Sequence, residues 1–387
     1  MFNDPMAVLT VLLVIEGGIL LLAEQRATKA LFKYLPSMFW IYFLPMVANS
    51  VGLIPAQSEV YGVLSKYLLP ACLVLMLLSV DLRAILKLGP IALGVMLAGS
   101  LGTLVGGPVV LAMFQHWLPP DMWMGFGALS ASWIGGSANM IAVKQGINAP
   151  DRVFLPMVVV DTIVPYVWMG VLVLLSGYQK WYDRWNRSRA GLIDELARRS
   201  QANHVQPQPI SLRHIVLMFT LAGSATLLSL RLADRLTAAE SMKTAWTIIL
   251  ASAIGLCVSF TPVRRLEAYG ASKLGYGMLY LILASIGAKT SLEHIAAAPI
   301  LLVAGAVWIL IHAGFIVLAG RLLRAPMGLM AAASQANIGG PASAPVVGGI
   351  YHPALAPVGL LLAILGNIIG TYLGFVCCEM CKFVSTT

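Results

Sequence analysis

The chain has 387 residues, of which 59% are apolar and only 11% are charged, and its mean hydropathy is +0.85. Soluble domains carry about 25% charged residues, so this composition excludes an ordinary soluble protein and indicates an all-α polytopic membrane protein. The apolar runs are continuous rather than alternating, which disfavours an outer-membrane barrel. The net charge of +9 is attributed to loops that set topology, because no basic-aromatic motif for nucleic acid accompanies it.

In chain order, a first set of apolar segments covers residues 7–24, 38–54, 64–81, 89–114, 124–146 and 154–178. A second set covers residues 213–231, 244–261, 274–290, 298–320, 327–350 and 355–378. The N-terminus lacks the positive start of a signal peptide, so the first segment is expected to be a retained helix. We therefore predict a first transmembrane repeat at 1–178 and a second at 213–387. The polar stretch 179–212 between them is predicted to be a cytoplasmic linker, with a short amphipathic helix around 186–200.

The repeat itself is carried by a polar, glycine-rich stretch that occurs twice. Residues 131–140 read A-S-W-I-G-G-S-A-N-M, and residues 335–344 read Q-A-N-I-G-G-P-A-S-A. Aligning 130–140 with 334–344 gives five identities in eleven positions, and Val80–Ile85 aligns upstream with Thr290–Ile295. Matched order of the segments predicts an internal repeat of about 175 residues, although glycine-rich membrane segments can also resemble one another by chance.

Loop charge separates two possible topologies. If all twelve segments cross the membrane, the 25 Lys and Arg residues divide 14 against 11, which is almost no bias. If segments 124–146 and 327–350 each enter and return on the same side, the division becomes 17 inside and 8 outside. We therefore predict ten crossings and two re-entrant hairpins or broken helices, in two inverted repeats of about five transmembrane helices each. A different segment that fails to cross would restore the same parity.

The Gly-Gly pairs explain what such breaks could hold. Gly135-Gly136 and Gly339-Gly340 permit turns with positive φ, and Pro341 favours a helix start. Each tip would expose N–H groups that attract an anion and carbonyl groups that can hold Na⁺. Inverted-repeat transporters place such tips at the bilayer midplane. The competing interpretation is helix packing, because small residues let helices approach closely.

The candidate site residues follow from these tips and from the few polar groups at membrane depth. The predicted substrate-binding residues are Ser137, Asn139, Gln335, Asn337 and Ser343. The predicted cation-binding residues are Gly135, Gly136, Asp161, Gly339, Gly340 and Asn367. Asp161 is an intramembrane acid, which is a functional candidate by default, with a structural ion pair as the alternative. Glu16 is a second such acid and ranks below Asp161 because it lies outside the strongest repeat.

No enzyme signature is present, and we expect no enzymatic activity. The chain has no HExxH, Walker or nucleophile-elbow motif. Three of its five cysteines, Cys377, Cys378 and Cys381, cluster near the end of the sequence, where we expect packing residues rather than metal ligands. We expect no cofactor and no metal beyond a transported Na⁺ or H⁺. The expected partners are the lipid bilayer and a small-molecule substrate, without nucleic acid.

The stretches Ile134–Asn139 and Ser334–Ser343 resemble the YjcL-like bacterial membrane family, a domain of unknown function, and the likeness covers essentially the whole chain. That family is grouped with the cation:proton antiporter and anion transporter superfamily, which includes glutamate:sodium and citrate:sodium symporters. The resemblance implies inverted five-helix repeats, elevator-type movement and a scaffold that dimerises, in the bacterial inner membrane. Asp161 has no paired acid, unlike the antiporters, which puts plain sodium/proton exchange in doubt.

Three functions remain open from the sequence. The leading hypothesis is a secondary active transporter that couples Na⁺, or alternatively H⁺, to a carboxylate, an amino acid or a small peptide. The second is a cation/proton antiporter with Asp161 as the exchanged site. The third is a non-transporting membrane receptor or scaffold, which would not depend on either Gly-Gly tip.

Overall fold

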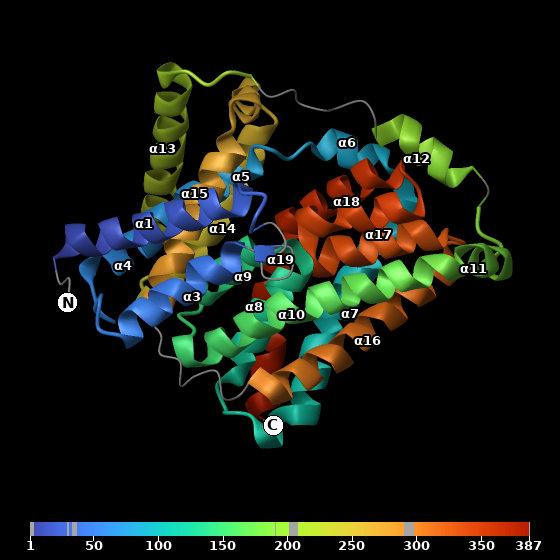
Figure 1. Cartoon of the computed structure of the whole chain (residues 1–387), viewed down its shortest axis with the longest axis horizontal. Helices are drawn as coiled ribbons and strands as arrows, with labels where there is room; N and C mark the ends of the chain where they lie inside the picture. The colour runs from blue at the N-terminus through green and yellow to red at the C-terminus, as the bar shows by residue number, and fades with distance from the viewer. Residues whose placement is uncertain are drawn as a thin grey trace. The chain divides into compact units, whose positions relative to one another are not determined.

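The structure is a computed structural model, and it describes residues 4–28, 31–32, 37–189, 191–200, 208–289 and 298–386. Every regular element in these described residues is a helix (Figure 1). The chain divides into two compact units. Unit 1 contains residues 1–79, 144–162 and 206–298, and unit 2 contains residues 80–143, 163–205 and 299–387. Each unit therefore combines pieces from both predicted repeats.

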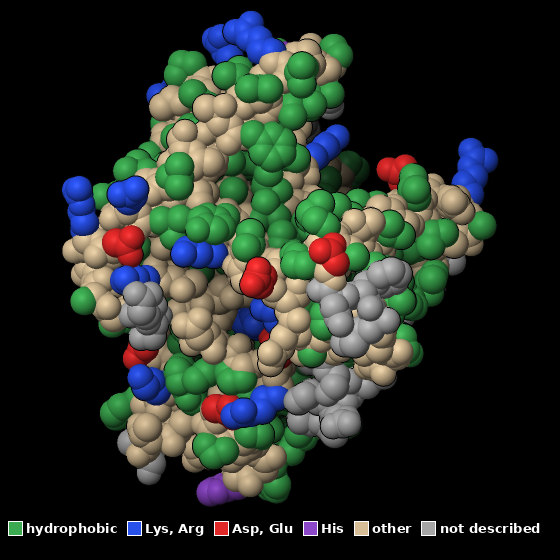
Figure 2. All heavy atoms as spheres, turned by 90° about the vertical axis from the view of Figure 1, so that its left-hand side faces the viewer, with side chains coloured by type: hydrophobic (Ala, Val, Ile, Leu, Met, Phe, Trp, Pro, Cys, Tyr) green, Lys and Arg blue, Asp and Glu red, His purple; other side chains and the backbone are tan. Residues whose placement is uncertain are grey.

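Length and hydropathy of the helices agree with the predicted membrane class. Nine helices in the described residues are long and apolar enough to cross a membrane. They correspond to nine of the ten predicted crossing segments. The tenth, α3 (Ser37–Ser50), has 14 residues and contains Pro45. Hydrophobic side chains lie exposed over wide areas of the face drawn in Figure 2, as a lipid-facing surface requires.

Unit 1 is built from the N-terminal helices and the first helices of the second repeat. Its elements are α1 (Pro5–Glu24), α3, α4 (Glu59–Val63), η1 (Leu64–Leu68), α5 (Leu69–Leu77), α13 (Leu212–Leu236), α14 (Glu240–Ser259), η5 (Pro262–Tyr269) and α15 (Ala271–Ala288). Its closest helix pairs bring α15 against α3 and α5, and α14 against α13 and α5. Helices of both predicted repeats thus share one core in this unit.

Unit 2 contains both Gly-Gly stretches. Its elements are α6 (Leu82–Lys87), α7 (Gly89–Phe114), η2 (Gln115–Trp117), α8 (Met122–Gly135), α9 (Ser137–Gly146), η3 (Ser176–Tyr178), α11 (Gln179–Asn186), α12 (Leu192–Ser200), α16 (Ala298–Leu322), α17 (Met327–Ile338), α18 (Gly340–Tyr351) and α19 (Leu355–Thr386). The last residues of α9 belong to unit 1, and α10 (Asp151–Leu175) passes from unit 1 into unit 2. The helix α19 is the centre of unit 2, because it contacts α7, α8, α12, α17 and α18.

Glycine brings α7 and α16 into close antiparallel contact. A side chain at Gly94 would meet Leu323, and one at Gly106 would collide with Trp308. Gly94 lies near the start of α7 and Leu323 directly follows the end of α16. Gly106 lies later in α7 and Trp308 earlier in α16, so the two helices run antiparallel. The close approach of the two backbones places His312 of α16 against Gly99 and Gly102 of α7.

The predicted linker differs in detail from the single helix expected around 186–200. Two short helices, α11 and α12, are separated by Arg187, which has φ 51° and ends α11. Leu192 and Leu196 of α12 are buried in the core of unit 2, so this part of the linker is packed against the unit. Residues 201–207 of the linker and the aligned stretch Thr290–Ile295 lie outside the described residues.

Candidate functional site

The first Gly-Gly stretch is a sharp break between α8 and α9. Gly136 has φ 91° and ψ 168°, a backbone conformation that glycine adopts without steric cost. Its N–H donates to Ser132 O at 2.5 Å and closes α8. The next helical residue, Ser137, is half-buried and begins α9.

The chain folds back at this break into a hairpin. A side chain at Gly374 of α19 would meet both Ala131, before the break, and Val143, after it. A side chain at Gly370 would meet Gly135 on one arm and Asn139 on the other. Because the two arms leave the tip and pass the same two levels of α19, α8 and α9 run antiparallel. We call this element hairpin 1 (residues 122–146).

The second Gly-Gly stretch makes a matching hairpin from α17 and α18, which lie side by side (Figure 1). Gly340 has φ 66°, and Pro341 stands in the first turn of α18. A side chain at Gly328, near the start of α17, would meet Tyr351 at the end of α18 at 2.8 Å. Across the tip, Gln335 Nε2 donates to Ser343 Oγ at 2.8 Å. We call this element hairpin 2 (residues 327–351).

Both hairpins rest on one face of α19 and approach it from opposite ends. Gly359 faces Ala344 of hairpin 2, whereas Gly366 faces Ile134 of hairpin 1. At 100° per residue, Gly359, Gly366, Gly370 and Gly374 fall within an arc of about 80°. Gly340, at the tip of hairpin 2, precedes Ala344 by four residues. Four residues span about 6 Å along α18, in the direction of Gly366. The two tips therefore reach α19 within about one helical turn of each other.

The predicted residues of hairpin 1 come together at its tip. Asn139 is buried, donates from Nδ2 to Gly135 O at 2.6 Å and accepts at Oδ1 from Thr371 Oγ1 at 2.5 Å. Asn367 Oδ1 lies 3.4 Å from the point where a side chain of Gly136 would begin. Asn139 thus uses its amide to hold the tip on α19, and Asn367 stands beside the break.

In hairpin 2, two of the predicted side chains lie at the tip, and a third bonds to the neighbouring helix α7. A side chain at Gly339 would collide with Gln335 and Ser343, so these two polar groups enclose the break. Asn337 instead points to α7, where it donates to Met96 O at 3.1 Å and accepts from Ser100 Oγ at 2.8 Å. The nitrogen and the oxygen of the Asn337 side-chain amide therefore both hold α17 on α7.

A histidine that the sequence analysis did not single out is the centre of a buried network. His312 Nδ1 lies 2.9 Å from Gly99 O, and its Nε2 lies 2.9 Å from Ser334 Oγ. Ser334 Oγ also accepts from Trp168 Nε1 at 2.9 Å. Gly99 O can only accept, so the network assigns the ring proton to Nδ1, and Ser334 donates to Nε2. Neutral His312 satisfies every partner, so it acts here as a positioning residue for hairpin 2.

The signal for His312 was present in the sequence. It is an ionisable residue in the middle of the apolar segment 298–320, a position that marks a functional or structural polar group by default. Its partners Thr103 and Ser334, and Trp168, which bonds to Ser334, come from three other segments, so no local motif connects them.

Three buried polar atoms in the hairpins have no hydrogen-bond partner within the described residues. They are Ser130 Oγ and Trp133 Nε1 of α8 and Gln335 Oε1 of α17. Neither hairpin contains an Asp or Glu residue. The tips therefore offer neutral oxygen ligands, unsatisfied polar atoms and the N-terminal ends of α9 and α18, whose first N–H groups are partly positive.

The predicted acids belong to unit 1, whereas the tips of both hairpins belong to unit 2. Asp161 is half-buried in the part of α10 that belongs to unit 1. Glu16 of α1, also in unit 1, is buried, and its Oε2 has no hydrogen-bond partner within the described residues. The nearest glycine to it is Gly277 of α15, where a side chain would begin 3.9 Å from Glu16 Oε1.

Comparison with known proteins agrees with the resemblance of the two glycine stretches. The family described as "Protein of unknown function (DUF819)" matches residues 10–384. The chain belongs to this family. It is also 25% identical over 344 residues to the "Uncharacterized membrane protein YjcL" of Bacillus subtilis (strain 168), covering 85% of this chain and 86% of that relative. The predicted YjcL-like family is confirmed, and this DUF819 chain is a membrane protein with multiple apolar helices.

Proposed function

We propose that this DUF819 chain is a secondary active transporter that couples Na⁺ to the movement of a small organic solute bearing a carboxylate. The observation that carries the proposal is the meeting of two glycine-broken hairpins on one face of α19, within about one turn of each other. Half-helix ends that converge inside a membrane are the arrangement used by transporters to hold ions and anionic substrates.

The chemistry of the tips supports coupling between the two ligands. The N-terminal ends of α9 and α18 favour a carboxylate, while carbonyl, amide and hydroxyl oxygens favour a hard cation. Because neither hairpin contains an acid, a cation bound there has no full negative charge from the hairpins. The carboxylate of the solute would supply that charge, so each ligand would raise the affinity for the other.

The approach of the hairpins from opposite ends of α19 supports the proposed topology. Two inverted repeats would place one tip from each membrane face near the bilayer midplane. The proposed arrangement has ten crossings, with the linker 179–212 in the cytoplasm and the chain in the bacterial inner membrane. Elevator-type movement and a homodimer complete the proposal, as the superfamily resemblance implies.

A cation/proton antiporter is the second candidate, and the intramembrane acids favour it. Asp161 is half-buried, and Glu16 is buried with an unpartnered Oε2 within the described residues. Acids at such positions are expected to bind a cation or carry a proton. Sodium-driven proton movement in dye-quench vesicles without any solute would favour antiport over symport.

The first test is a thermal-shift screen of the purified full chain against carboxylates, amino acids and small peptides, with Na⁺ and with choline in its place. Symport predicts a solute that stabilises the protein strongly only when Na⁺ is present. A receptor or scaffold would show no solute whose effect depends on Na⁺ and no loss of ligand binding when Gly136 or Gly340 is replaced by Ala. Either result would remove the symport proposal.

Asp161 is tested separately in proteoliposomes. Asp161→Asn keeps the size of the side chain and removes its charge, so we expect uptake to lose its dependence on a cation gradient. Glu24→Gln is the matched control, because Glu24 is exposed at the end of α1 and has no part in the proposed site. Unchanged cation dependence in Asp161→Asn would remove Asp161 from the mechanism.

A further inference from the structure

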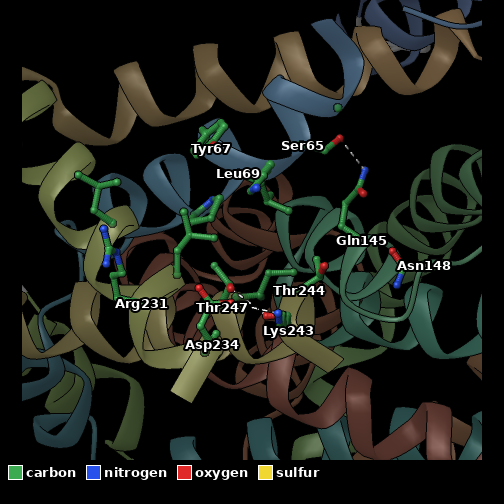
Figure 3. A pocket seen from close by; sticks show the side chains of 17 residues that line it. Ser65, Tyr67, Leu69, Gln145, Asn148, Arg231, Asp234, Lys243, Thr244 and Thr247 are labelled. Atoms are coloured by element: carbon green, nitrogen blue, oxygen red, sulfur yellow. Dashed lines mark hydrogen bonds and ion pairs between the residues drawn. The ribbon is translucent and has the colours of Figure 1, made fainter. Parts of the chain in front are cut away.

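A separate cavity in unit 1 has the lining expected of an anion site at a membrane surface. It has a volume of about 510 Å³, within the range of ligand pockets, and is open on one side. Its walls come from α13, the start of α14, α4 and η1 with the start of α5, and Gln145 and Asn148 at and just after the end of hairpin 1 (Figure 3). None of the residues proposed for the transport site lines it.

Charge in the cavity is predominantly positive. Lys66, Arg231 and Lys243 line it together with a single carboxylate, Asp234. Lys243 Nζ lies 3.3 Å from Asp234 Oδ1, which neutralises one of the three cations. In Figure 3 this pair lies between Arg231 on one side and Gln145 on the other. The lining therefore carries two positive charges in excess.

The polar groups opposite the cations suit a ligand that carries hydroxyls. Gln145 Nε2 donates to Ser65 Oγ at 3.2 Å, which fixes the amide at the edge of the cavity. Asn148 and Thr244 also line this part. Amide and hydroxyl groups both donate and accept hydrogen bonds, so they can recognise glycerol oxygens next to a phosphate.

Apolar side chains complete the lining and continue onto the lipid-facing surface. Leu69, Leu230 and Ile248 line the cavity, and Leu227 lines it while remaining 60% exposed. Arg231 lies in the last turns of α13 and Lys243 in the first turn of α14. Ends of membrane-length helices lie at headgroup depth, so one ligand could place its phosphate among the cations and its chain along Leu227.

The backbone also departs from a regular helix at this cavity. Residues Leu64–Leu68 form a π-helical turn, and Ser65, Lys66 and Tyr67 of that turn all line the cavity. Single π-turns within helices are rare and are frequent at functional sites. This feature is independent of the charge of the lining and marks the same place.

We propose that this cavity binds the phosphate headgroup of an anionic, hydroxyl-bearing phospholipid of the phosphatidylglycerol type, with its acyl chain against α13. Lys66 and Arg231 hold the phosphate, Lys243 is shared between the phosphate and Asp234, and the amides of Gln145 and Asn148 hold the glycerol hydroxyls. The site is distinct from the transport site and does not depend on what is transported.

The test is native mass spectrometry of the full chain in detergent, titrated with phosphatidylglycerol, with phosphatidylcholine of the same acyl chains, and with inorganic phosphate. We expect tight binding of phosphatidylglycerol, which is weakened by salt. We expect affinity to fall about fivefold for Lys66→Gln or Arg231→Gln and about 25-fold for the double variant, since each basic residue contributes about that factor at a membrane surface. Arg235→Gln is the matched control, because Arg235 is exposed at the same end of α13 and does not line the cavity.

Asp234→Asn provides a second and opposite test. Removing the carboxylate frees Lys243 from its ion pair, so phosphatidylglycerol should bind more tightly, a gain that misfolding cannot imitate. Equal binding of the two lipids, or an equal loss in Arg235→Gln, would overturn the proposal. Binding of inorganic phosphate without preference for phosphatidylglycerol would overturn the lipid as the source and identify a soluble phosphate ligand.

Discussion

Hairpin 1 and hairpin 2 share a repeated sequence around their breaks but are held in place by different interactions. At the position where hairpin 2 has Asn337, hydrogen-bonded to Met96 O and Ser100, hairpin 1 has Trp133. The Trp133 ring packs on Trp308 with centroids 5.1 Å apart, and its N–H has no partner within the described residues. Hairpin 2 is therefore anchored to α7 and α16 by directed hydrogen bonds, whereas hairpin 1 relies on ring packing and on Asn139.

The difference matters because the two kinds of contact tolerate movement differently. Buried hydrogen bonds are directional, and a group left without its partner costs about 1–3 kcal/mol. Ring packing is less directional and keeps much of its energy through small shifts. If one tip moves during transport, hairpin 1 is the one whose anchoring permits it.

Gly366→Ala should have the largest effect, because hairpin 1 packs on α19 through a close approach of the two backbones at this position. A methyl group there would collide with Ile134 O, a backbone atom that cannot rotate away. We expect a loss of about 3 kcal/mol in the free energy of unfolding, measured as a lower melting temperature. Gly17→Ala is the control, because nothing lies within 4 Å of that position. Equal melting temperatures for the two variants would contradict the packing of hairpin 1 on α19.

His312→Ala should destabilise hairpin 2 selectively. It removes a fully buried ring and its hydrogen bonds to Ser334 Oγ and Gly99 O, at a cost of about 3 kcal/mol. Ser334 then keeps only the contact with Trp168, and Gly99 O keeps only that with Thr103. Hydrogen exchange should increase in α17 and remain unchanged in α8. Asn139→Ala should give the opposite pattern at a lower cost of about 2 kcal/mol, because it removes two hydrogen bonds of hairpin 1. Uniform exchange changes across both hairpins would show that they are not anchored independently.

Trp133→Phe should have the smallest effect on stability, because its N–H has no partner to lose within the described residues. Trp308→Phe removes the same atoms but loses the hydrogen bond from Nε1 to Thr103 O at 2.8 Å, so it should cost about 1 kcal/mol more. If the N–H of Trp133 binds the solute, Trp133→Phe should raise the KM for uptake while lowering the melting temperature less than Trp308→Phe does. A melting temperature as low as that of Trp308→Phe would mean that this N–H has a structural partner.

The breaks in the hairpins were predictable because glycine and proline act through local backbone geometry. Gly136 and Gly340 adopt positive φ, and the backbone of each hairpin turns at the Gly-Gly pair of the repeated stretch. The residues around each tip were likewise predictable, since Asn139 and Ser343 stand at equivalent positions of the repeat. Their neutral oxygens and the missing acids could be read directly from the sequence.

The partners of these residues were not predictable, because they come from distant segments. Asn337 meets Ser100 across 237 residues, and Thr371 meets Asn139 across 232. One short amphipathic helix was predicted within the linker, around residues 186–200. The structure has α12 at Leu192–Ser200 and a further helix, α11, before it, and Arg187 at φ 51° and Gly191 at φ 74° lie between the two. The burial of Leu192 and Leu196 depends on tertiary packing, which periodicity alone does not reveal.

The glycine face of α19 has a consequence for how the protein is made. This face receives both hairpins, yet α19 follows them in the chain. At about 5–20 residues per second, the ribosome needs tens of seconds to progress from Gly135 to the end of α19. During that interval the tip of hairpin 1, with its broken backbone, lacks the surface that covers it. Its polar groups must therefore be sheltered by the insertion machinery until the last helix arrives, and slowing translation between the hairpins should increase degradation of the nascent chain.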